Sequence, residues 1–206
     1  MSHHASPLAA LYHALLSELD DWFAKARADF PGVIPCRSGC SACCHGPFDI
    51  SIADILLVRE GVAALPAETQ SLVRERAHAS AARLLKLAPD WQAPFAIADL
   101  GEDRFDAITD ALAAEPCPLL DDAGNCSIYE SRPLVCRMIG LGMLTDGGRT
   151  IENACPIQED FPAYVVLPPQ PFDLERFEEV EATFLEAAAA ELLGTPAAAE
   201  FETTIA

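Results

Sequence analysis

Apolar residues recur at helical spacing in three long segments, and the first of these lies near the start of the chain. Ser6 is of a type preferred at a helix N-cap, and Pro7 suits the first helical position. Pro31-Gly32 would end the helix. The pattern therefore predicts an amphipathic helix over about residues 5–30. Its apolar positions are Leu8, Leu11, Tyr12, Leu15, Leu16, Leu19, Trp22, Phe23 and Ala26.

The other two long segments lie in the middle and near the end of the chain. One predicted helix opens at Pro66 and ends before Pro89. The other covers about 172–194 and ends at Gly194, and the residues after it, 195–206, are expected to form a frayed tail. The main apolar positions of these two helices are Val73, Ala77, Ala81 and Leu85, and then Leu174, Phe177, Val180, Phe184, Leu185, Ala188 and Leu192.

Shorter elements are predicted between the long helices. Ser51 can cap a short helix with Asp54 three residues later, and we expect that helix to run through about Glu60 and to close at Gly61. A weaker pattern predicts a further helix over 104–114.

After Pro116 the character of the chain changes to short extended pieces separated by turn residues. The sequence predicts a hairpin that begins at Cys117, a helical turn from Ser131, and a second hairpin over 144–151. The expected fold class is mainly α with small β-hairpins, in which amphipathic helices surround a cysteine-rich loop region. We expect a single domain over 1–206, with the cysteine-rich core at 35–156.

Composition limits the classes of partner. The chain has 13 Lys+Arg against 32 Asp+Glu, a formal net charge of -19, which would repel phosphate backbones and anionic lipid headgroups. The sequence therefore argues against nucleic acid and membrane surfaces as partners. The first thirty residues lack the pattern of a signal peptide, and no apolar run reaches the ~20 residues that span a bilayer. We therefore expect a cytoplasmic protein.

In the cytoplasm the eight cysteines would stay reduced, so their number favours metal binding over disulfides. The first group, Cys36-x3-Cys40-x2-Cys43-Cys44, could aim three or four sulfurs at one point. The second group consists of Cys117, Cys126, Cys136 and Cys155. Zinc and iron, including an iron-sulfur cluster, are the candidate metals.

Spacing alone leaves the arrangement of these ligands open. Neighbouring side chains diverge in an extended chain, so one of Cys43 and Cys44 could reach a second metal or join the later cysteines. Eight sulfurs could satisfy two four-coordinate ions, or one cluster with further ligands or free thiols. The first three cysteines have the spacing of radical S-adenosylmethionine enzymes. That family is rejected because Ala42 replaces its aromatic residue and no barrel pattern follows.

The full order of motifs resembles the YkgJ-type cysteine-cluster family, a zinc- or iron-chelating domain. The run from Cys36 to Cys44 is followed by Cys117-Pro-Leu-Leu, by Cys126-Ser-Ile-Tyr-Glu-Ser-Arg-Pro-Leu-Val-Cys136-Arg, and by Cys155. The resemblance spans about residues 35–156 and implies metal binding by all eight cysteines. Some relatives are flagellin lysine methylases with an iron-sulfur cluster. This chain shows no methyl-donor motif, so that activity is not transferred to it.

Four residues beside the cysteines are candidates for a supporting role. Arg132 and Arg137 could stabilise the negative charge of several thiolates by donating to sulfur or backbone. Tyr129 is expected to pack, and His45 is an additional candidate ligand or proton donor that more simply faces solvent. No catalytic residue can be named.

Three functional hypotheses follow from the sequence. The first is a metal-binding module that sequesters or senses zinc or iron. The second is an iron-sulfur enzyme of the group-transfer type, similar to a protein lysine methylase. The third is a metallochaperone that passes its ion to a protein partner.

Overall fold

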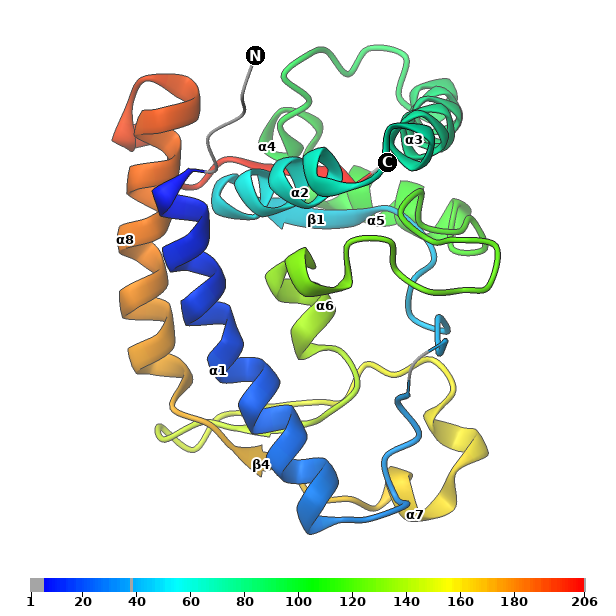
Figure 1. Cartoon of the computed structure of the whole chain (residues 1–206), viewed down its shortest axis with the longest axis vertical. Coiled ribbons are helices and arrows are strands. Elements are labelled where there is room, and N and C mark those ends of the chain that lie inside the picture. Colours follow the sequence, from blue (N-terminus) through cyan, green and yellow to red (C-terminus); the bar gives the residue numbers. More distant parts are fainter. Residues whose placement is uncertain (1–5, 38, 206) are drawn as a thin grey trace.

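Two long helices form one side of the molecule. The computed structural model describes residues 6–37 and 39–205, with α1 at Pro7–Asp29 and α8 at Leu174–Leu193. The two helices lie side by side and run in opposite directions (Figure 1). Ser6 is the extended N-cap of α1, and Pro7 is its first residue, as predicted. The apolar stripes of both helices enter the largest buried cluster, which explains why they pair.

A third helix, α2 (Ile52–Ala64), packs against both of them. The predicted cap is present, because the Ser51 hydroxyl accepts from the Asp54 amide and the Asp54 carboxylate accepts from the Ser51 amide. The helix does not end at Gly61 as predicted. Gly61 is buried in the helix, where an added Cβ would lie 2.7 Å from the Ser131 Cβ. Glycine here permits close packing rather than a helix end.

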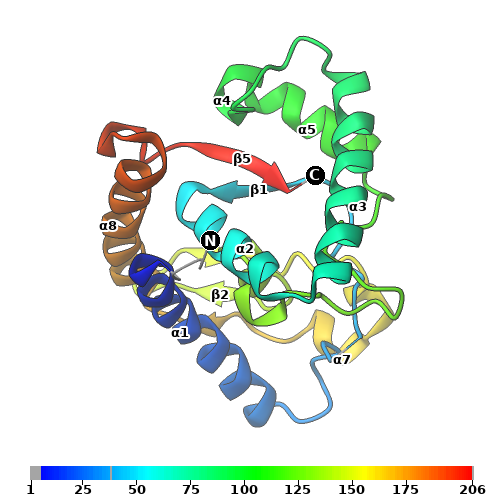
Figure 2. The same cartoon turned by 45° about the horizontal axis from the view of Figure 1, so that its top comes forward.

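The middle of the chain forms a second helical layer beside the first. It contains α3 (Ala67–Leu87), α4 (Ile97–Leu100) and α5 (Glu102–Ala111). The helix predicted over 104–114 is thus present but begins and ends earlier. Apolar residues between and along these helices form a separate buried cluster, whose largest members are Trp91 and Phe105. Figure 2 shows α4 and α5 above β1 and β5, and α3 at the right of these strands.

Short strands connect distant parts of the chain. β1 (Phe48–Ser51) pairs antiparallel with β5 (Glu202–Ile205), so the prediction of a frayed tail is wrong for this segment. Ile205 is buried beside Ile50 in a third cluster, and a 3-10 turn at Pro196–Ala198 leads into the strand. The tail is ordered because it completes a sheet edge that no local pattern reveals.

A second small sheet lies at the other end of the molecule. β2 (Met143–Leu144) and β3 (Thr150–Ile151) form the predicted hairpin, and β4 (Gln170–Pro171) pairs parallel with β2. Short helical segments fill the connections: η1 (Tyr129–Ser131), α6 (Leu134–Met138), η2 (Gln158–Asp160) and α7 (Pro162–Val165).

The predicted fold class, mainly α with small β elements and cysteines in the loops, is confirmed. Within residues 6–37 and 39–205, no helix has both the length and the apolar character needed to cross a membrane.

Candidate metal centre

The first four cysteines lie in the loop that connects α1 to β1. This loop runs along the side of the molecule away from α8, past α7 and up to β1 (Figure 1). Tight turns fold it, because the Cys40 amide donates to the Arg37 carbonyl and the Cys44 amide donates to the Ser41 carbonyl, each at 2.9 Å. Cys36, Cys40, Cys43 and Cys44 are all half-buried. The turns therefore crowd four thiols into one short segment.

Backbone bonds attach the next cysteine to this loop. The Cys117 amide donates to the Cys44 carbonyl at 2.9 Å, and the Gly46 amide donates to the Glu115 carbonyl at 2.7 Å. His45 and Pro116 face each other in an isolated antiparallel bridge. These contacts hold Cys44 and Cys117 side by side although the two residues are far apart in the sequence.

The remaining cysteines reach the same region by different elements. The hairpin predicted from Cys117 consists of a single bridge between Leu120 and Cys126. The short helix α6 carries Cys136, as predicted. Cys155 follows β3, where its amide donates to the Asn153 carboxamide at 3.0 Å, and it is the buried member of the set. All eight cysteines are free thiols.

The first set of neighbouring thiols contains Cys36, Cys40, Cys43 and Cys155. The pKa of Cys36 is raised to about 11, chiefly by burial and also by negative charge on Cys155, Cys40 and Cys43. Cys36 and Cys155 also belong to the same apolar cluster, the one built on α1 and α8. Cys155 therefore joins the loop cysteines although it follows them by more than a hundred residues.

The second set contains Cys44, Cys117, Cys126 and Cys136. Burial raises the pKa of Cys136, and negative charge on Cys117 and Cys126, on Asp54 and on Cys43 of the first set adds to this effect. Burial likewise raises the pKa of Cys117 to about 11, with a further contribution from Cys126. Cys117 and Cys126 pack against the apolar cluster of β1 and β5 rather than that of α1 and α8.

The two sets meet at the adjacent residues Cys43 and Cys44. The two adjacent side chains interact directly, which lowers the pKa of Cys43 and raises that of Cys44. Charge on Cys136 and Cys117 also raises the pKa of Cys44. The interaction therefore favours the thiolate of Cys43 over that of Cys44.

The cysteine sulfurs are suitable metal ligands, but their arrangement in this structure does not yet form a metal site. Sulfur ligands in sets of four are the donors that zinc and iron-sulfur centres prefer. Among the residues that the structure describes, however, no three His, Cys, Asp or Glu side chains already converge as ligands of one ion. The thiols share two neighbourhoods, and side chains would have to move to bring four sulfurs to one point.

Comparison with protein families agrees with the order of the cysteines. A family model named CxxCxxCC and described as a "Putative zinc- or iron-chelating domain" matches residues 35–156, more than half of the chain. The chain belongs to the CxxCxxCC family. Neither the curated proteins nor the solved structures contain a match to it. The predicted family resemblance is confirmed, and the matched segment holds all eight cysteines.

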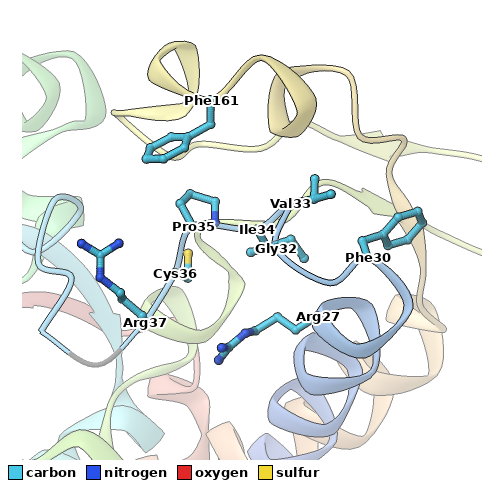
Figure 3. A pocket seen from close by; sticks show the side chains of 9 residues that line it. All are labelled: Arg27, Phe30, Gly32, Val33, Ile34, Pro35, Cys36, Arg37 and Phe161. Carbon is cyan, nitrogen blue, oxygen red and sulfur yellow. The ribbon is translucent and has the colours of Figure 1, made fainter.

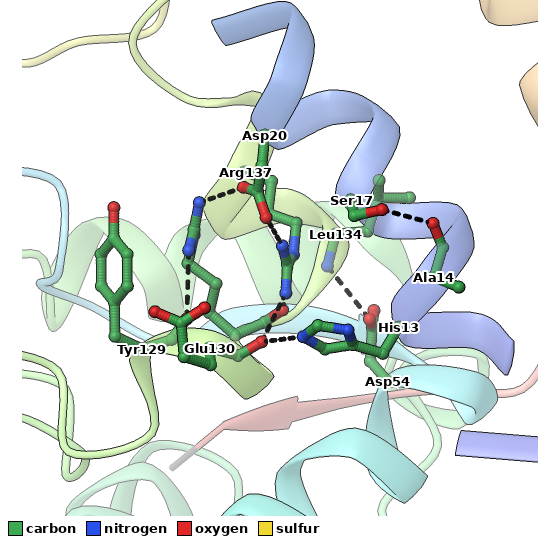
Figure 4. Close-up of polar contacts among 10 residues, drawn as sticks. His13, Ala14, Ser17, Asp20, Asp54, Tyr129, Glu130, Leu134 and Arg137 are labelled. Atoms are coloured by element: carbon green, nitrogen blue, oxygen red, sulfur yellow. Dashed lines mark hydrogen bonds and ion pairs between the residues drawn. The ribbon is translucent and has the colours of Figure 1, made fainter. Parts of the chain in front are cut away.

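Arg137 of α6 lies between α6 and α1 (Figure 4), and Arg132 precedes the same short helix. Both donate to the Asp20 carboxylate of α1. Arg137, whose side chain is 0% exposed, also donates to the carbonyls of Arg132 at 3.0 Å and Glu130 at 2.8 Å. Arg132 is near enough to Cys126 for its charge to lower the pKa of that thiol in part, although burial raises it overall.

The other two predicted neighbours lie at the surface. Tyr129 is 57% exposed, and its ring packs against the Arg132 guanidinium carbon, which is 4.1 Å from the ring centroid. His45 is exposed, and its backbone forms the bridge to Pro116. Tyr129 and His45 therefore lie at the surface, each close in sequence to a cysteine: His45 follows Cys44, and Tyr129 lies three residues after Cys126.

Sequence reasoning missed two residues that touch the first set of thiols. The Tyr164 hydroxyl, on α7, is buried and donates to the Gly140 carbonyl. A Cβ on Gly140 would lie 3.0 Å from the Cys36 sulfur and 3.6 Å from the Tyr164 hydroxyl. Neither residue belongs to a cysteine motif or a periodic pattern, so only the folded structure reveals them.

Proposed function

We propose that this protein binds two zinc or iron centres through its eight cysteines, with four thiolates at each centre. The observation that carries the proposal is the division of the thiols into two sets of four that meet at Cys43 and Cys44. A four-thiolate site is complete without water or substrate, which is typical of structural or metal-retaining sites. The proposed role is therefore a metal-binding module rather than a catalyst.

The proposed ligands of the first centre are Cys36, Cys40, Cys43 and Cys155. Those of the second centre are Cys44, Cys117, Cys126 and Cys136. Negative charge on Cys136 and Cys117 acts on Cys44, whereas Cys43 acts on Cys36, which supports assigning Cys43 and Cys44 to different centres. Each centre then takes ligands both from the loop after α1 and from the later part of the chain.

Metal binding at these positions would release protons. Thiols bind metals as thiolates, and burial keeps the pKa of Cys36 and Cys117 near 11 in the metal-free protein. The bound cation would replace the proton as the positive partner of each sulfur. Because the ligands come from distant segments, the binding free energy would also stabilise the fold.

Metal and acid-labile sulfide analysis of untagged protein, purified without oxygen, tests the proposal first. Two zinc ions per chain without sulfide, or two four-thiolate iron sites, would support two separate centres. Iron with sulfide and a brown colour would favour an iron-sulfur cluster and bring group-transfer chemistry forward. Protein that retains neither metal after incubation with zinc or ferrous iron would contradict the proposal.

Cysteine substitutions test how the ligands divide. Cys155→Ser and Cys117→Ser should each remove about one of the two ions, since each disables one centre, whereas Ser41→Ala in the same loop should remove none. Cys40→Ser should behave as Cys155→Ser does, with a loss of stability as well.

Double substitutions give a sharper test at the junction. Cys155→Ser with Cys43→Ser affects a single proposed centre and should leave about one ion. Cys155→Ser with Cys44→Ser affects both centres and should leave almost none. Equal metal content in the two double variants would contradict the division of the thiols.

A further inference from the structure

A cavity of about 360 Å³ opens at the end of α1, beside the first cysteine of the loop. Figure 3 shows its wall, which comes from the last turn of α1, from the segment that follows it, and from Phe161 just before α7. Cys36 contributes to the wall. The volume falls within the range of about 300–1,000 Å³ that small-molecule sites usually have.

Two positive side chains border this cavity in a protein that is otherwise strongly acidic. Arg27 and Arg37 are both exposed. Seven of the other arginines are neutralised by carboxylates, whereas Arg59 and Arg74 form no such ion pair among the described residues: the seven are Arg76, Arg83, Arg104, Arg132, Arg137, Arg149 and Arg176. Among residues 6–37 and 39–205, no such ion pair includes Arg27 or Arg37. Arg27 and Arg37 differ from the other unpaired arginines, Arg59 and Arg74, because both line one cavity.

The helix dipole explains only one of them. Arg27 lies in the last turn of α1, where a positive charge interacts favourably with the carbonyl end of the helix. Arg37 lies in a loop, outside any helix, so that explanation does not extend to it. Both arginines line the cavity.

The rest of the wall is largely apolar. Phe30 and Phe161 are half-buried, and Ile34 is 8% exposed. A guanidinium group matches the geometry of a carboxylate or phosphate, whereas the aromatic and branched side chains match a hydrocarbon body. A ligand that satisfies both parts carries an acid group on a compact apolar frame.

We propose that this cavity binds a small organic acid, which pairs its acid group with Arg27 and Arg37 and packs its apolar body against Ile34 and Phe161. Because Cys36 forms part of the wall, the bound acid would lie beside the first set of thiols. The inference depends on the charge and shape of the cavity and holds whether or not the cysteines bind metal.

The test is a titration of the full-length protein, with whatever metal it retains, followed by amide chemical shifts. Benzoate serves as the probe, benzamide as its uncharged analogue, and inorganic phosphate as an acid group without an apolar body. Benzoate should bind saturably, with a dissociation constant of about 1 mM or below. Benzamide and phosphate should each bind at least about tenfold more weakly. Benzamide lacks the charged acid group, and phosphate lacks the apolar body.

Substitutions identify the site. Arg27→Gln and Arg37→Gln should each weaken benzoate binding about tenfold, since each removes a charge-assisted hydrogen bond. Arg74→Gln, on the exposed side of α3, is the matched control and should leave binding unchanged. Metal content measured on the same samples separates loss of the acid site from loss of the cysteine centres.

Three outcomes would overturn the inference. They are the absence of saturable benzoate binding, equal affinity for benzoate and benzamide, and arginine variants at the cavity that bind benzoate as well as Arg74→Gln does. If phosphate binds as tightly as benzoate, the apolar wall does not contribute to binding.

Discussion

Gly140 shows how a single residue without a side chain shapes the surroundings of a thiol. Its φ of +103° lies in the region that favours glycine, and its Cα lies close to Cys36 and Tyr164. The Gly140 carbonyl also accepts the hydrogen bond of the buried Tyr164 hydroxyl on α7. The Gly140 backbone, the Tyr164 phenol and the Cys36 thiol are thus packed closely together.

Gly140→Ala should therefore destabilise the protein and weaken the first proposed centre. The new methyl group would lie 3.0 Å from the Cys36 sulfur in a backbone conformation that L-residues rarely adopt. We expect a loss of about 2–3 kcal/mol in the free energy of unfolding, measured by urea denaturation, and a lower zinc content. Gly148→Ala is the control, because Gly148 has a φ of +80° but no atom within 4 Å of the added Cβ. It should cost only the backbone term of about 1 kcal/mol and leave the zinc content unchanged.

The sequence predicts the cysteines as candidate ligands, but it does not predict the roles of Gly140 and Tyr164. The eight cysteines are recognisable from spacing because ligand motifs are local and ordered along the chain. Gly140 and Tyr164 act through contacts between segments that no spacing records. The same holds for the division of the thiols, since Cys155 joins Cys36 only when α7 and the loop after α1 come together.

At the scale of elements, one carboxylate connects α1 to the segment that carries Cys136. Asp20 accepts from Arg132 and from Arg137, and the Arg137 side chain is fully buried. His13 Nε2, also on α1, lies 2.7 Å from the Glu130 carbonyl oxygen that Arg137 contacts (Figure 4). Asp20 therefore neutralises a buried cation and holds α6 against α1.

Asp20→Asn should strongly weaken this connection. Removing the negative partner leaves the buried Arg137 charge uncompensated, which costs roughly 3 kcal/mol in the free energy of unfolding. Asp21→Asn, at the exposed position next to it, should change stability by less than about 0.5 kcal/mol. Urea denaturation of the two variants gives the comparison, and equal midpoints would show that Asp20 is not a structural partner of Arg137.

Three helices enclose a second buried polar group. The Tyr12 hydroxyl of α1 donates to Glu181 of α8 at 2.8 Å and lies 3.4 Å from Asp54 of α2. Burial raises the pKa of both carboxyl groups, and the hydrogen bond from Tyr12 lowers them only in part. Asp54 also accepts from the Leu134 amide at 3.0 Å, so the group extends to the start of α6.

Glu181→Gln should reduce the loss of stability as pH rises. A carboxyl whose folded pKa is raised contributes full stability below its unfolded pKa of about 4.3 and loses that contribution as pH rises through the folded pKa. Glutamine keeps the acceptor for Tyr12 but has no charge to bury. Relative to the unchanged protein, the variant should therefore gain stability as pH rises above about 4.3. Glu186→Gln, exposed on the same helix, is the control, and parallel pH curves for all three proteins would contradict the argument.

Elements with a strong local pattern were predicted most successfully. The long helices were predicted because their apolar residues recur every three to four positions and their caps are local. Gly61 was interpreted as a helix end because its close neighbour, Ser131, lies seventy residues away. The strand β5 was missed for a similar reason, since a four-residue strand depends on its partner β1 rather than on its own sequence.

At the scale of the whole molecule, the two sets of thiols border different parts of the core. Cys36 and Cys155 pack with the cluster of α1, α2 and α8, whereas Cys117 and Cys126 pack with the cluster that includes β1 and β5. The loop from Cys36 to Cys44 contributes to both sets. Two bound ions would therefore tie this loop to both clusters, and metal would stabilise the molecule as a whole.

Removal of metal should accordingly lower global stability. A ligand that binds only the folded state at a thousand times its dissociation constant adds about 4 kcal/mol, so the chelated protein should unfold at a clearly lower urea concentration than the zinc-loaded one. Zinc should restore the midpoint, whereas magnesium, which prefers oxygen ligands, should not. Cys155→Ser with Cys44→Ser, which disables both proposed centres, should be insensitive to the chelator. If the unchanged protein unfolds at the same urea concentration with and without metal, the cysteines do not link the two clusters through an ion.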